Sequence, residues 1–343
     1  MFERIAIMGC GSMGTVLGAY LSRAGLDVTM VDPYVEHVEA LNKNGATVTG
    51  GVEFNTPVKA CTPENMEGKF DLFFYLAKQT YNDTAIPQMV EHSHEKTYIA
   101  TGQNGLPELA VAKYWPKSQI MGFPISWSGN FVGPGVSRIA CTETDGTFEF
   151  HLGSVEGPIT PEVLEVQKIL QKMCPNTTHL TETLMADRWG KVMINASWSG
   201  MSTVMASTFA DAINDPRSGV CLVRIGRETV RTCHAMGITI PIIFGADYDK
   251  IYDFTDKAGE DLAIETVKKI IGTNTGKASM LQDLEKGRRC EIAMINGVVS
   301  EAAREHGIET PYCDAVVRIV SEIEEGKRPL TSANVNDMPD LPL

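Results

Sequence analysis

The stretch that decides the fold lies at the start of the chain and reads RIAIMGCGSMG (residues 4–14). Its first half is a short apolar run, typical of a strand buried in a parallel sheet, and its second half has the spacing Gly-x-Gly-x-x-Gly. Residues 12–24 continue with helical spacing up to Gly25, and residues 28–31 form a second apolar run that ends at Asp32. Strand, helix and strand within about 30 residues predict a βαβ unit.

The glycine-rich segment follows the predicted strand and opens the predicted helix, as dinucleotide binding requires. Gly9 permits a tight turn, Gly11 lets the backbone approach a pyrophosphate, and Gly14 lets helix and strand pack closely. The start of the helix attracts phosphate charge. The predicted cofactor-binding residues of this segment are Gly9, Cys10, Gly11, Ser12, Met13 and Gly14. The alternatives are a glycine turn that only packs and, at Cys10, a redox-sensitive thiol instead of a small residue tolerated in a tight loop.

Asp32 indicates which cofactor is used. A carboxylate at the end of the second strand accepts hydrogen bonds from an unmodified ribose and repels a 2′-phosphate. Residues 33–36 (PYVE) contain no arginine to replace it. The sequence therefore favours NADH/NAD, with NADPH/NADP as the alternative.

Further runs extend the predicted sheet. Apolar stretches at 71–77, 97–101 and 119–124, with a helical segment at 83–92, predict a parallel, doubly wound sheet. Two β-rich runs within 136–153, around Asp145-Gly146, predict an antiparallel hairpin at its edge. From about Thr183 the patterns become long and helical. We therefore predict an α/β protein, with a Rossmann-type domain at 1–182 and an all-helical domain at 183–343 for substrate binding and dimerisation.

Bulk composition excludes several classes of protein. The chain has 343 residues, a net charge of −13 and 43% apolar residues, and its pI is near 5.1, which disfavours nucleic acids and anionic membranes as partners. Its eight cysteines include no C-x-x-C pair, so neither a disulfide framework nor a metal site is predicted. The N-terminus resembles no signal peptide and no long apolar run occurs, so a cytoplasmic location is expected.

The stretch GKVMINASWSG (residues 190–200) places polar residues in an apolar helical pattern. Lys191, Asn195 and Ser199 are spaced four apart and would share one helix face. They could be a lysine reaching the surface and an asparagine bonded to backbone. Alternatively, they line a site that binds an anionic substrate without a globally basic protein.

Four more motifs favour the second interpretation. Lys78 and Asn104 follow predicted strands in the segments AKQ (77–79) and QNGL (103–106), and SMLQD (279–283) precedes EIAMING (291–297). Together with Lys191 and Asn195, these motifs resemble the ketopantoate reductase (2-dehydropantoate 2-reductase) family over nearly the whole chain. The resemblance implies a Rossmann domain, an all-helical domain and an active site in the cleft between them. It also implies reduction of a 2-oxo acid by hydride transfer from a nicotinamide, in pantothenate and coenzyme A synthesis.

The resemblance also assigns roles to residues. Lys191 matches the catalytic lysine that protonates the carbonyl oxygen, and Glu291 matches the catalytic acid that holds the substrate hydroxyl and the lysine's surroundings. Asn195 and Ser279 match substrate-binding positions. Lys78 and Asn104 match residues near the nicotinamide and its ribose. Without the resemblance, Lys78 and Glu291 could be solvated residues, and Asn104 could belong to a plain turn.

Two departures from the family pattern bear on specificity. Where members commonly have a second substrate-binding asparagine followed by proline, this chain has Ser199-Gly200, which leaves another 2-oxo or 3-hydroxy acid as an alternative substrate. Where members often have a basic residue suited to NADPH, this chain has Asp32. A non-catalytic NAD-binding protein is a third alternative, but it would be expected to lack Lys191. A homodimer formed through the helical part is compatible with these assignments.

Overall fold

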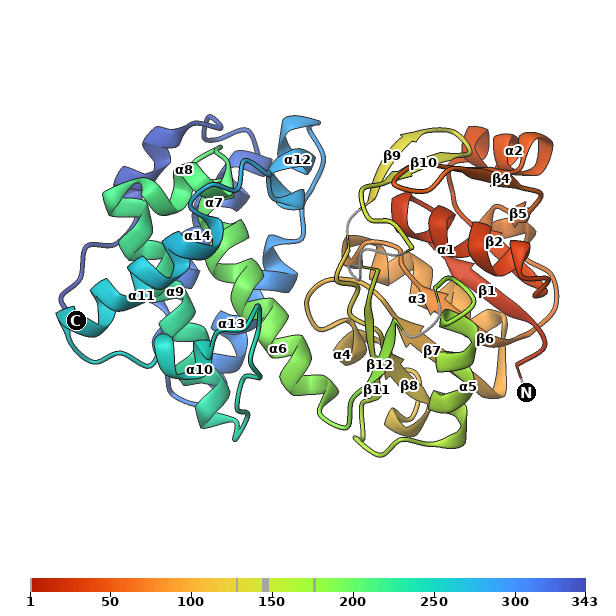
Figure 1. The fold of residues 1–343 in the computed structure, drawn as a ribbon, viewed down its shortest axis with the longest axis horizontal. Coiled ribbons are helices and arrows are strands. Elements are labelled where there is room, and N and C mark those ends of the chain that lie inside the picture. Colours follow the sequence, from red (N-terminus) through yellow and green to blue (C-terminus); the bar gives the residue numbers. More distant parts are fainter. Residues whose placement is uncertain (1, 128, 144–147, 175–176) are drawn as a thin grey trace. The chain divides into compact units, whose positions relative to one another are not determined.

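The computed structural model describes residues 2–127, 129–143, 148–174 and 177–343. The chain divides into two compact units, which are coloured by sequence in Figure 1. The first comprises Met1–Gln103 and Pro107–Leu184, and the second comprises Asn104–Leu106 and Met185–Leu343. The short segment after the strand that ends at Thr101 thus groups with the second unit.

The first unit contains an eight-stranded sheet in its described part, with the order β12-β11-β8-β7-β6-β1-β2-β5. β1 pairs in parallel with β2 on one side and with β6 on the other, and β6 pairs in parallel with β7. The predicted parallel sheet is confirmed. Its strands are β1 (Ile5–Met8), β2 (Val28–Val31), β5 (Lys59–Cys61), β6 (Phe70–Tyr75), β7 (Ser93–Thr101), β8 (Ile120–Gly122), β11 (Phe150–Ser154) and β12 (Thr178–Leu180).

Helices cover both faces of this sheet. Along β1, Ile5 and Ile7 belong to one buried cluster, while Ala6 and Met8 belong to another. Because successive side chains of a strand point to opposite faces, the two clusters are the two faces of the sheet. α1 and α5 contribute to the first cluster, α3 and α4 to the second. The helices are α1 (Ser12–Arg23), α2 (Val35–Asn44), α3 (Asn82–Glu91), α4 (Pro107–Val111) and α5 (Pro161–Leu170).

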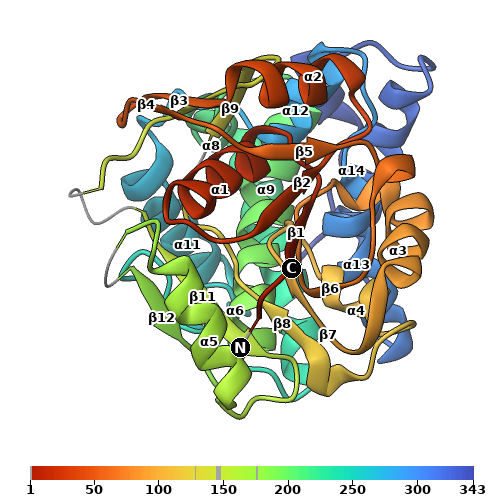
Figure 2. The same ribbon diagram turned by 90° about the vertical axis from the view of Figure 1, so that its right-hand side faces the viewer.

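A second sheet lies beside α1, as Figure 2 shows, with the order β4-β3-β10-β9. Its strands are β3 (Ala46–Gly50), β4 (Phe54–Thr56), β9 (Gly129–Gly133) and β10 (Val136–Ile139). A Cβ added to Gly129 in β9 would lie 2.8 Å from the Ser12 hydroxyl, so β9 lies directly against the start of α1. The second sheet therefore extends the wall of the first unit at the glycine-rich loop.

The predicted hairpin within 136–153 is wrong. β10 pairs with β3 and with β9, whereas β11 pairs with β8 and with β12, so the two runs lie in different sheets. Both edges of β10 are occupied, which leaves no edge for β11. The turn Asp145-Gly146 lies outside the described residues. The hairpin that does form joins β9 and β10 near Gly135, whose φ is +75°.

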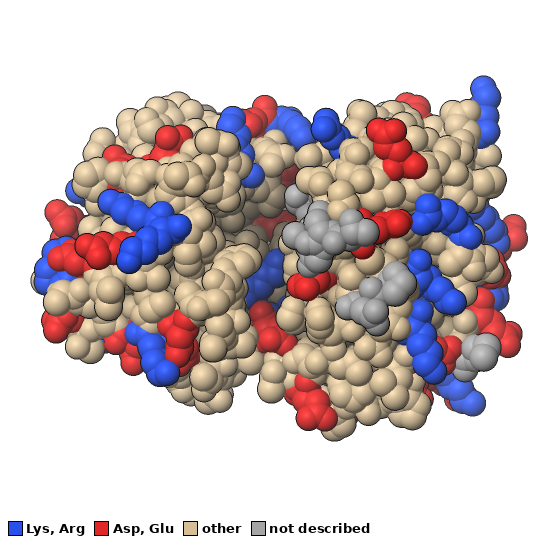
Figure 3. Space-filling view, in the orientation of Figure 1, with Lys and Arg blue, Asp and Glu red and all other residues tan. Residues whose placement is uncertain are grey.

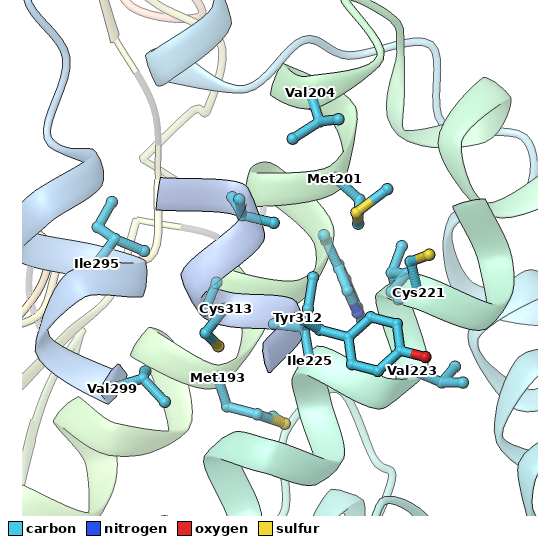
Figure 4. Close-up of a cluster of buried hydrophobic side chains, with 14 of the residues drawn as sticks. Met193, Met201, Val204, Cys221, Val223, Ile225, Ile295, Val299, Tyr312 and Cys313 are labelled. Carbon is cyan, nitrogen blue, oxygen red and sulfur yellow. The ribbon is translucent and has the colours of Figure 1, made fainter. Parts of the chain in front are cut away.

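The second unit is built from helices packed around one apolar cluster, and part of this cluster is drawn in Figure 4. Met193, Ile225 and Ile295 bring three different helices together there. The helices are α6 (Leu184–Ile194), α7 (Gly200–Val204), α8 (Phe209–Asn214), α9 (Pro216–Ala235), α10 (Tyr248–Ile251), α11 (Lys257–Ile271), α12 (Ser279–Glu285), α13 (Ile292–Glu305) and α14 (Pro311–Glu324). Among the described residues, no helix has the length and apolar character needed to cross a membrane.

Candidate functional site

Four neighbouring parallel strands bring the predicted cofactor residues of the first unit to one edge of the sheet. Met8 is opposite Val31 and Tyr75, and Tyr75 is opposite Thr101, so the last residues of β2, β1, β6 and β7 lie in register at one edge of the sheet. Adjacent strands lie about 4.8 Å apart. The segments that follow these strands therefore begin next to one another. They are Asp32 after β2, the glycine-rich loop after β1 and the Lys78 segment after β6. Parallel α/β sheets bind ligands at this edge.

The glycine-rich loop has the backbone that the motif predicts. Gly9 has a φ of +96°, and a Cβ on it would lie 2.2 Å from the Ala77 nitrogen. A Cβ on Gly14 would lie 2.1 Å from the Gly9 carbonyl oxygen. Gly11 differs, because a Cβ there would meet no atom of the described protein within 4 Å. Gly9 and Gly14 thus shape the loop, while Gly11 leaves open space in front of it.

The N-terminus of α1 fits a phosphate. Its N-cap is Gly11, which has no side chain with which to cap the first-turn amides. Asp215 and Asp256, by contrast, cap α9 and α11 with their side chains. Uncapped amides and the positive end of a helix dipole form an anion site when a glycine loop leads into them.

Cys10 and Asp32 are linked within the loop. One Asp32 carboxylate oxygen accepts a hydrogen bond from the Cys10 backbone nitrogen at 2.8 Å, and the other accepts from the Tyr34 nitrogen at 3.0 Å. The Cys10 thiol is buried, and burial together with the Asp32 charge raises its pKa well above the ordinary value. A thiol held in its protonated form is a poor nucleophile, which supports the interpretation of Cys10 as a small packing residue.

The two remaining predicted cofactor residues are half-buried. Lys78 follows β6 and stands at the N-cap of a short 3₁₀ turn. Asn104 lies beyond β7, next to Gly105, whose φ is +76°. The left-handed backbone at Gly105 shows that Asn104 sits in a tight loop of fixed shape.

In the second unit, Lys191 lies near the end of α6 and is partly buried. Burial is the main cause that lowers its pKa, from 10.5 to about 7. The positive charge of Arg188, one helical turn earlier, lowers the pKa further, while the negative charge of Glu291 raises it. Lys191 and Glu291 are therefore electrostatically coupled, and the lysine can exchange a proton near neutral pH.

The helix does not continue in α-helical form past Lys191. Asn195–Ser199 is a π-helical turn, and α7 begins at Gly200. Lys191 lies on α6 just before the junction, whereas Asn195 is the first residue of the π turn and Ser199 is its last residue and is buried. The three residues thus lie on one continuous helical segment, whose second part is π-helical and not α-helical. π-helical turns occur often at functional sites.

Glu291 and Ser279 lie on two helices that both pack against this π turn. Glu291 is buried at the N-cap of α13, and Ser279 is the exposed first residue of α12. On α13, the buried Asn296 donates a hydrogen bond from its Nδ2 to the Ala196 carbonyl oxygen at 3.0 Å. The structure thus gathers the predicted residues of the second unit around one turn.

Sequence reasoning missed three residues here. Arg188 is fully buried and has a charge that acts on Lys191, Asn296 bonds the π turn, and His37 bonds the glycine-rich loop. The sequence holds only weak signals for them, because Arg188 is one helical turn from Lys191 and Asn296 lies in the EIAMING motif. In the described part of the chain, no three His, Cys, Asp or Glu side chains gather as metal ligands would.

We expect two glycine variants to separate the folding of the loop from binding. In Gly11→Ala the methyl meets no protein atom, so the variant should fold, with a melting temperature lowered by a few degrees because alanine is a poorer N-cap than glycine. The methyl nevertheless obstructs an approaching pyrophosphate. The dissociation constants of NADH and NADPH should then rise at least tenfold, as measured by calorimetry. Gly14→Ala should lower both stability and affinity, because its Cβ collides with a backbone oxygen. Unchanged affinity in Gly11→Ala would contradict the placement of the cofactor at this loop.

Two family models and a bacterial relative match this chain. Residues 5–155 match the family model described as ketopantoate reductase PanE/ApbA, and residues 183–324 match the model described as the C-terminal part of that family. The 2-dehydropantoate 2-reductase of Lactococcus lactis subsp. lactis (strain IL1403) is 26% identical over 330 residues, covering 94% of this chain and 98% of its own.

Two solved structures share the fold. D-mandelate dehydrogenase, solved with NADH and anilino(oxo)acetate, superposes with a TM-score of 0.80 at 20% identity, covering 94% of this chain and 99% of its own. A dimeric ketopantoate reductase from Staphylococcus aureus superposes with a TM-score of 0.73 at 18% identity, covering 95% of this chain and all of its own. At these identities the likeness concerns the fold alone.

Proposed function

Because the chain belongs to the ketopantoate reductase family, we propose that it reduces the 2-oxo group of ketopantoate to pantoate with a nicotinamide cofactor. Pantoate is a precursor in pantothenate and coenzyme A synthesis. The observation that carries the proposal is the coupled pair of Lys191 and Glu291 beside the π turn of a helical unit that matches the family.

Lys191 is proposed as the general acid. When the cofactor delivers hydride to the carbonyl carbon, negative charge grows on the oxygen. A positioned ammonium stabilises that charge and gives up a proton to form the hydroxyl. A pKa of about 7 suits this task, because the lysine is then protonated in a large fraction of molecules and still releases its proton readily.

The other polar residues around the π turn are proposed to bind the substrate. Glu291 accepts a hydrogen bond from the substrate hydroxyl and favours the charged form of Lys191. Asn195, Ser199 and Ser279 are proposed to donate hydrogen bonds to the 2-oxo acid. Basic residues near the site, including Arg188, offset the negative charge of the substrate in a protein whose net charge is −13. On the face drawn in Figure 3, acidic and basic side chains are interspersed.

The first unit is proposed to bind the cofactor. The residues fit a dinucleotide, because the space before Gly11 is open and the α1 amides carry no side-chain cap. Lys78 and Asn104 are assigned to the nicotinamide end. Asp32 is assigned to the adenosine ribose, for which its carboxylate favours NADH over NADPH.

We expect Asp32→Ser to reduce the preference for NADH over NADPH at least tenfold. The substitution removes the repulsion of the 2′-phosphate and the acceptor for the ribose hydroxyls. The ratio of kcat/KM values for the two cofactors measures this effect. Asp32→Asn is the matched control for the loop, because its amide oxygen can still accept a hydrogen bond from the Cys10 nitrogen. A wild-type enzyme that already prefers NADPH would contradict the role of Asp32.

The decisive experiment is steady-state reduction of ketopantoate, followed by cofactor absorbance, with NADH and NADPH in parallel. Turnover with either cofactor supports the proposed reaction, and faster turnover with NADH supports the assignment of Asp32. Protein that binds NADH and yet turns over ketopantoate with neither cofactor would refute the proposed substrate.

A related reductase of another 2-oxo or hydroxy acid is the second candidate function, and Ser199-Gly200 favours it. A serine is shorter than the family asparagine, so a different acid could reach the π turn. The shared fold of D-mandelate dehydrogenase is compatible with this candidate. A panel of aliphatic and aromatic 2-oxo acids distinguishes the two candidates by kcat/KM.

We also propose that the protein forms a homodimer, an assignment supported by the dimeric Staphylococcus aureus enzyme of the same fold. Light scattering coupled to size-exclusion chromatography tests it. A mass near 37 kDa at micromolar protein would refute the dimer, because that is the mass of one chain.

A further inference from the structure

A buried histidine bonds the carbonyl at the centre of the glycine-rich loop. His37 lies on α2, and only 1% of it is exposed. Its Nε2 lies 2.7 Å from the Cys10 carbonyl oxygen and 3.2 Å from the Thr15 hydroxyl. Its Nδ1 accepts a hydrogen bond from the Gly135 backbone nitrogen at 2.8 Å. One side chain thus joins the loop, α1 and the β9–β10 turn.

These contacts define one protonation state of the ring. A backbone N–H can only donate, so the Gly135 contact requires an unprotonated Nδ1. The ring proton of the neutral form then sits on Nε2 and points at the Cys10 oxygen. The arrangement fits the neutral Nε2–H tautomer, and a proton added at Nδ1 would face the Gly135 N–H.

The peptide groups of Cys10 are held on both sides. Its carbonyl oxygen accepts from His37 and also from the Thr15 hydroxyl at 2.6 Å, while its nitrogen donates to Asp32 at 2.8 Å. Cys10 stands between Gly9 and Gly11, whose permissive backbones would otherwise let the loop change shape. The contacts to Cys10 therefore fix the turn that leads into α1.

We propose that His37 is a positioning residue for the cofactor loop, and that its neutral form is required for full dinucleotide affinity. This inference rests on the proposed binding of a dinucleotide at Gly9–Gly14. Protonation of His37 in acid breaks the bond to Gly135 and releases the loop from the β9–β10 turn. Cofactor affinity then falls with pH through a group that does not touch the cofactor.

The groups around His37 determine the pH at which it is protonated. Burial is the largest influence and lowers the pKa of His37, whereas the bond to Cys10 and the charge of Asp32 raise it. The Cys10 thiol stays protonated, and the rings of Tyr34 and Phe131 flank the imidazole with centroids 6.4 and 5.1 Å away. The net shift is downward, so His37 is neutral at pH 7 and charges only in more acidic solution.

The test is calorimetric titration of the full-length protein with NAD⁺ and with NADP⁺ between pH 5 and pH 8, without substrate. For the wild type, we expect a constant dissociation constant near pH 8 and a rise towards pH 5, with a slope of at most tenfold per pH unit because one proton is taken up. His37→Gln can still donate to the Cys10 carbonyl but does not titrate, so its affinity should depend little on pH. His94→Gln is the control, because it removes a half-exposed histidine of the same unit that pairs with Asp71. It should keep the wild-type profile.

Three results would overturn the proposal. A flat wild-type profile would show that no such titration controls binding, and an acid loss that persists in His37→Gln would assign it to another group. A lower melting temperature in His37→Gln with the wild-type profile retained would leave His37 a purely structural role. No binding of either dinucleotide at pH 8 would refute the proposed function as well, whereas binding without pH dependence would overturn only the role of His37.

Discussion

Lys191→Ala should lower kcat for reduction of the 2-oxo acid by a factor of about 10²–10⁴, the usual contribution of a positioned general acid. The substitution removes the ammonium that stabilises the developing oxyanion and supplies its proton. The dissociation constants of NADH and NADPH should change less than threefold, because Lys191 is not among the proposed cofactor residues, which apart from Asn104 lie in the first unit. Steady-state kinetics and calorimetry measure the two quantities.

Two further variants test whether the loss of kcat comes specifically from the missing proton donor at position 191. Lys191→Arg keeps a positive charge but holds its proton too tightly to donate it, so it should also lose at least a hundredfold in kcat. Lys269→Ala removes an exposed lysine of α11 and should leave kcat unchanged. Full activity in a folded Lys191→Ala protein would eliminate Lys191 as the acid.

The sequence predicts the central sheet well because its signals are local. β1, β2 and β6 are short apolar runs with loop residues at their ends, and a strand buried on both faces needs nothing else. The second sheet could not be predicted in the same way. Its strands have three to five residues and find partners far along the chain, as when β10 pairs with β3. The hairpin prediction failed because it gave a nearby run preference over those distant partners.

The candidate site likewise contains some residues that the sequence reveals and some features that it does not. Lys191 and Asn195 are recognisable because their spacing breaks an apolar helical pattern, and Gly9 and Gly14 because the motif prescribes their backbone. The π turn is invisible in sequence, since Asn195–Ser199 reads as ordinary helix and the turn becomes apparent only with tertiary contacts such as that of Asn296. The role of His37 could not be predicted either. Its partners are backbone groups of distant segments, and every residue has such groups, so the sequence does not indicate which of them His37 contacts.

The pH profile of kcat/KM for the reduction should have an alkaline limb near pH 7. The profile of kcat/KM reports ionisation of the free enzyme, and Lys191 has a pKa of about 7. Reduction needs the protonated lysine, whose fraction falls from about one half at pH 7 to about one hundredth at pH 9, so kcat/KM should drop about fiftyfold over this range. Oxidation of the hydroxy acid needs the neutral lysine, so its kcat/KM should instead rise with pH up to about 7 and then level off.

Variants of the two charged neighbours should move this limb in opposite directions. Arg188→Met removes a positive charge that lowers the pKa of Lys191, so the limb should shift to higher pH. Glu291→Gln removes a negative charge that raises the pKa, so the limb should shift to lower pH, together with a weaker maximum from lost substrate contacts. Arg188 is fully buried, so circular dichroism is used to check that Arg188→Met is folded. If it is not folded, Glu291→Gln alone still tests the direction of the shift. Removing a nearby positive charge raises the pKa of a group and removing a nearby negative charge lowers it, so shifts in the same direction would assign the limb to a residue other than Lys191.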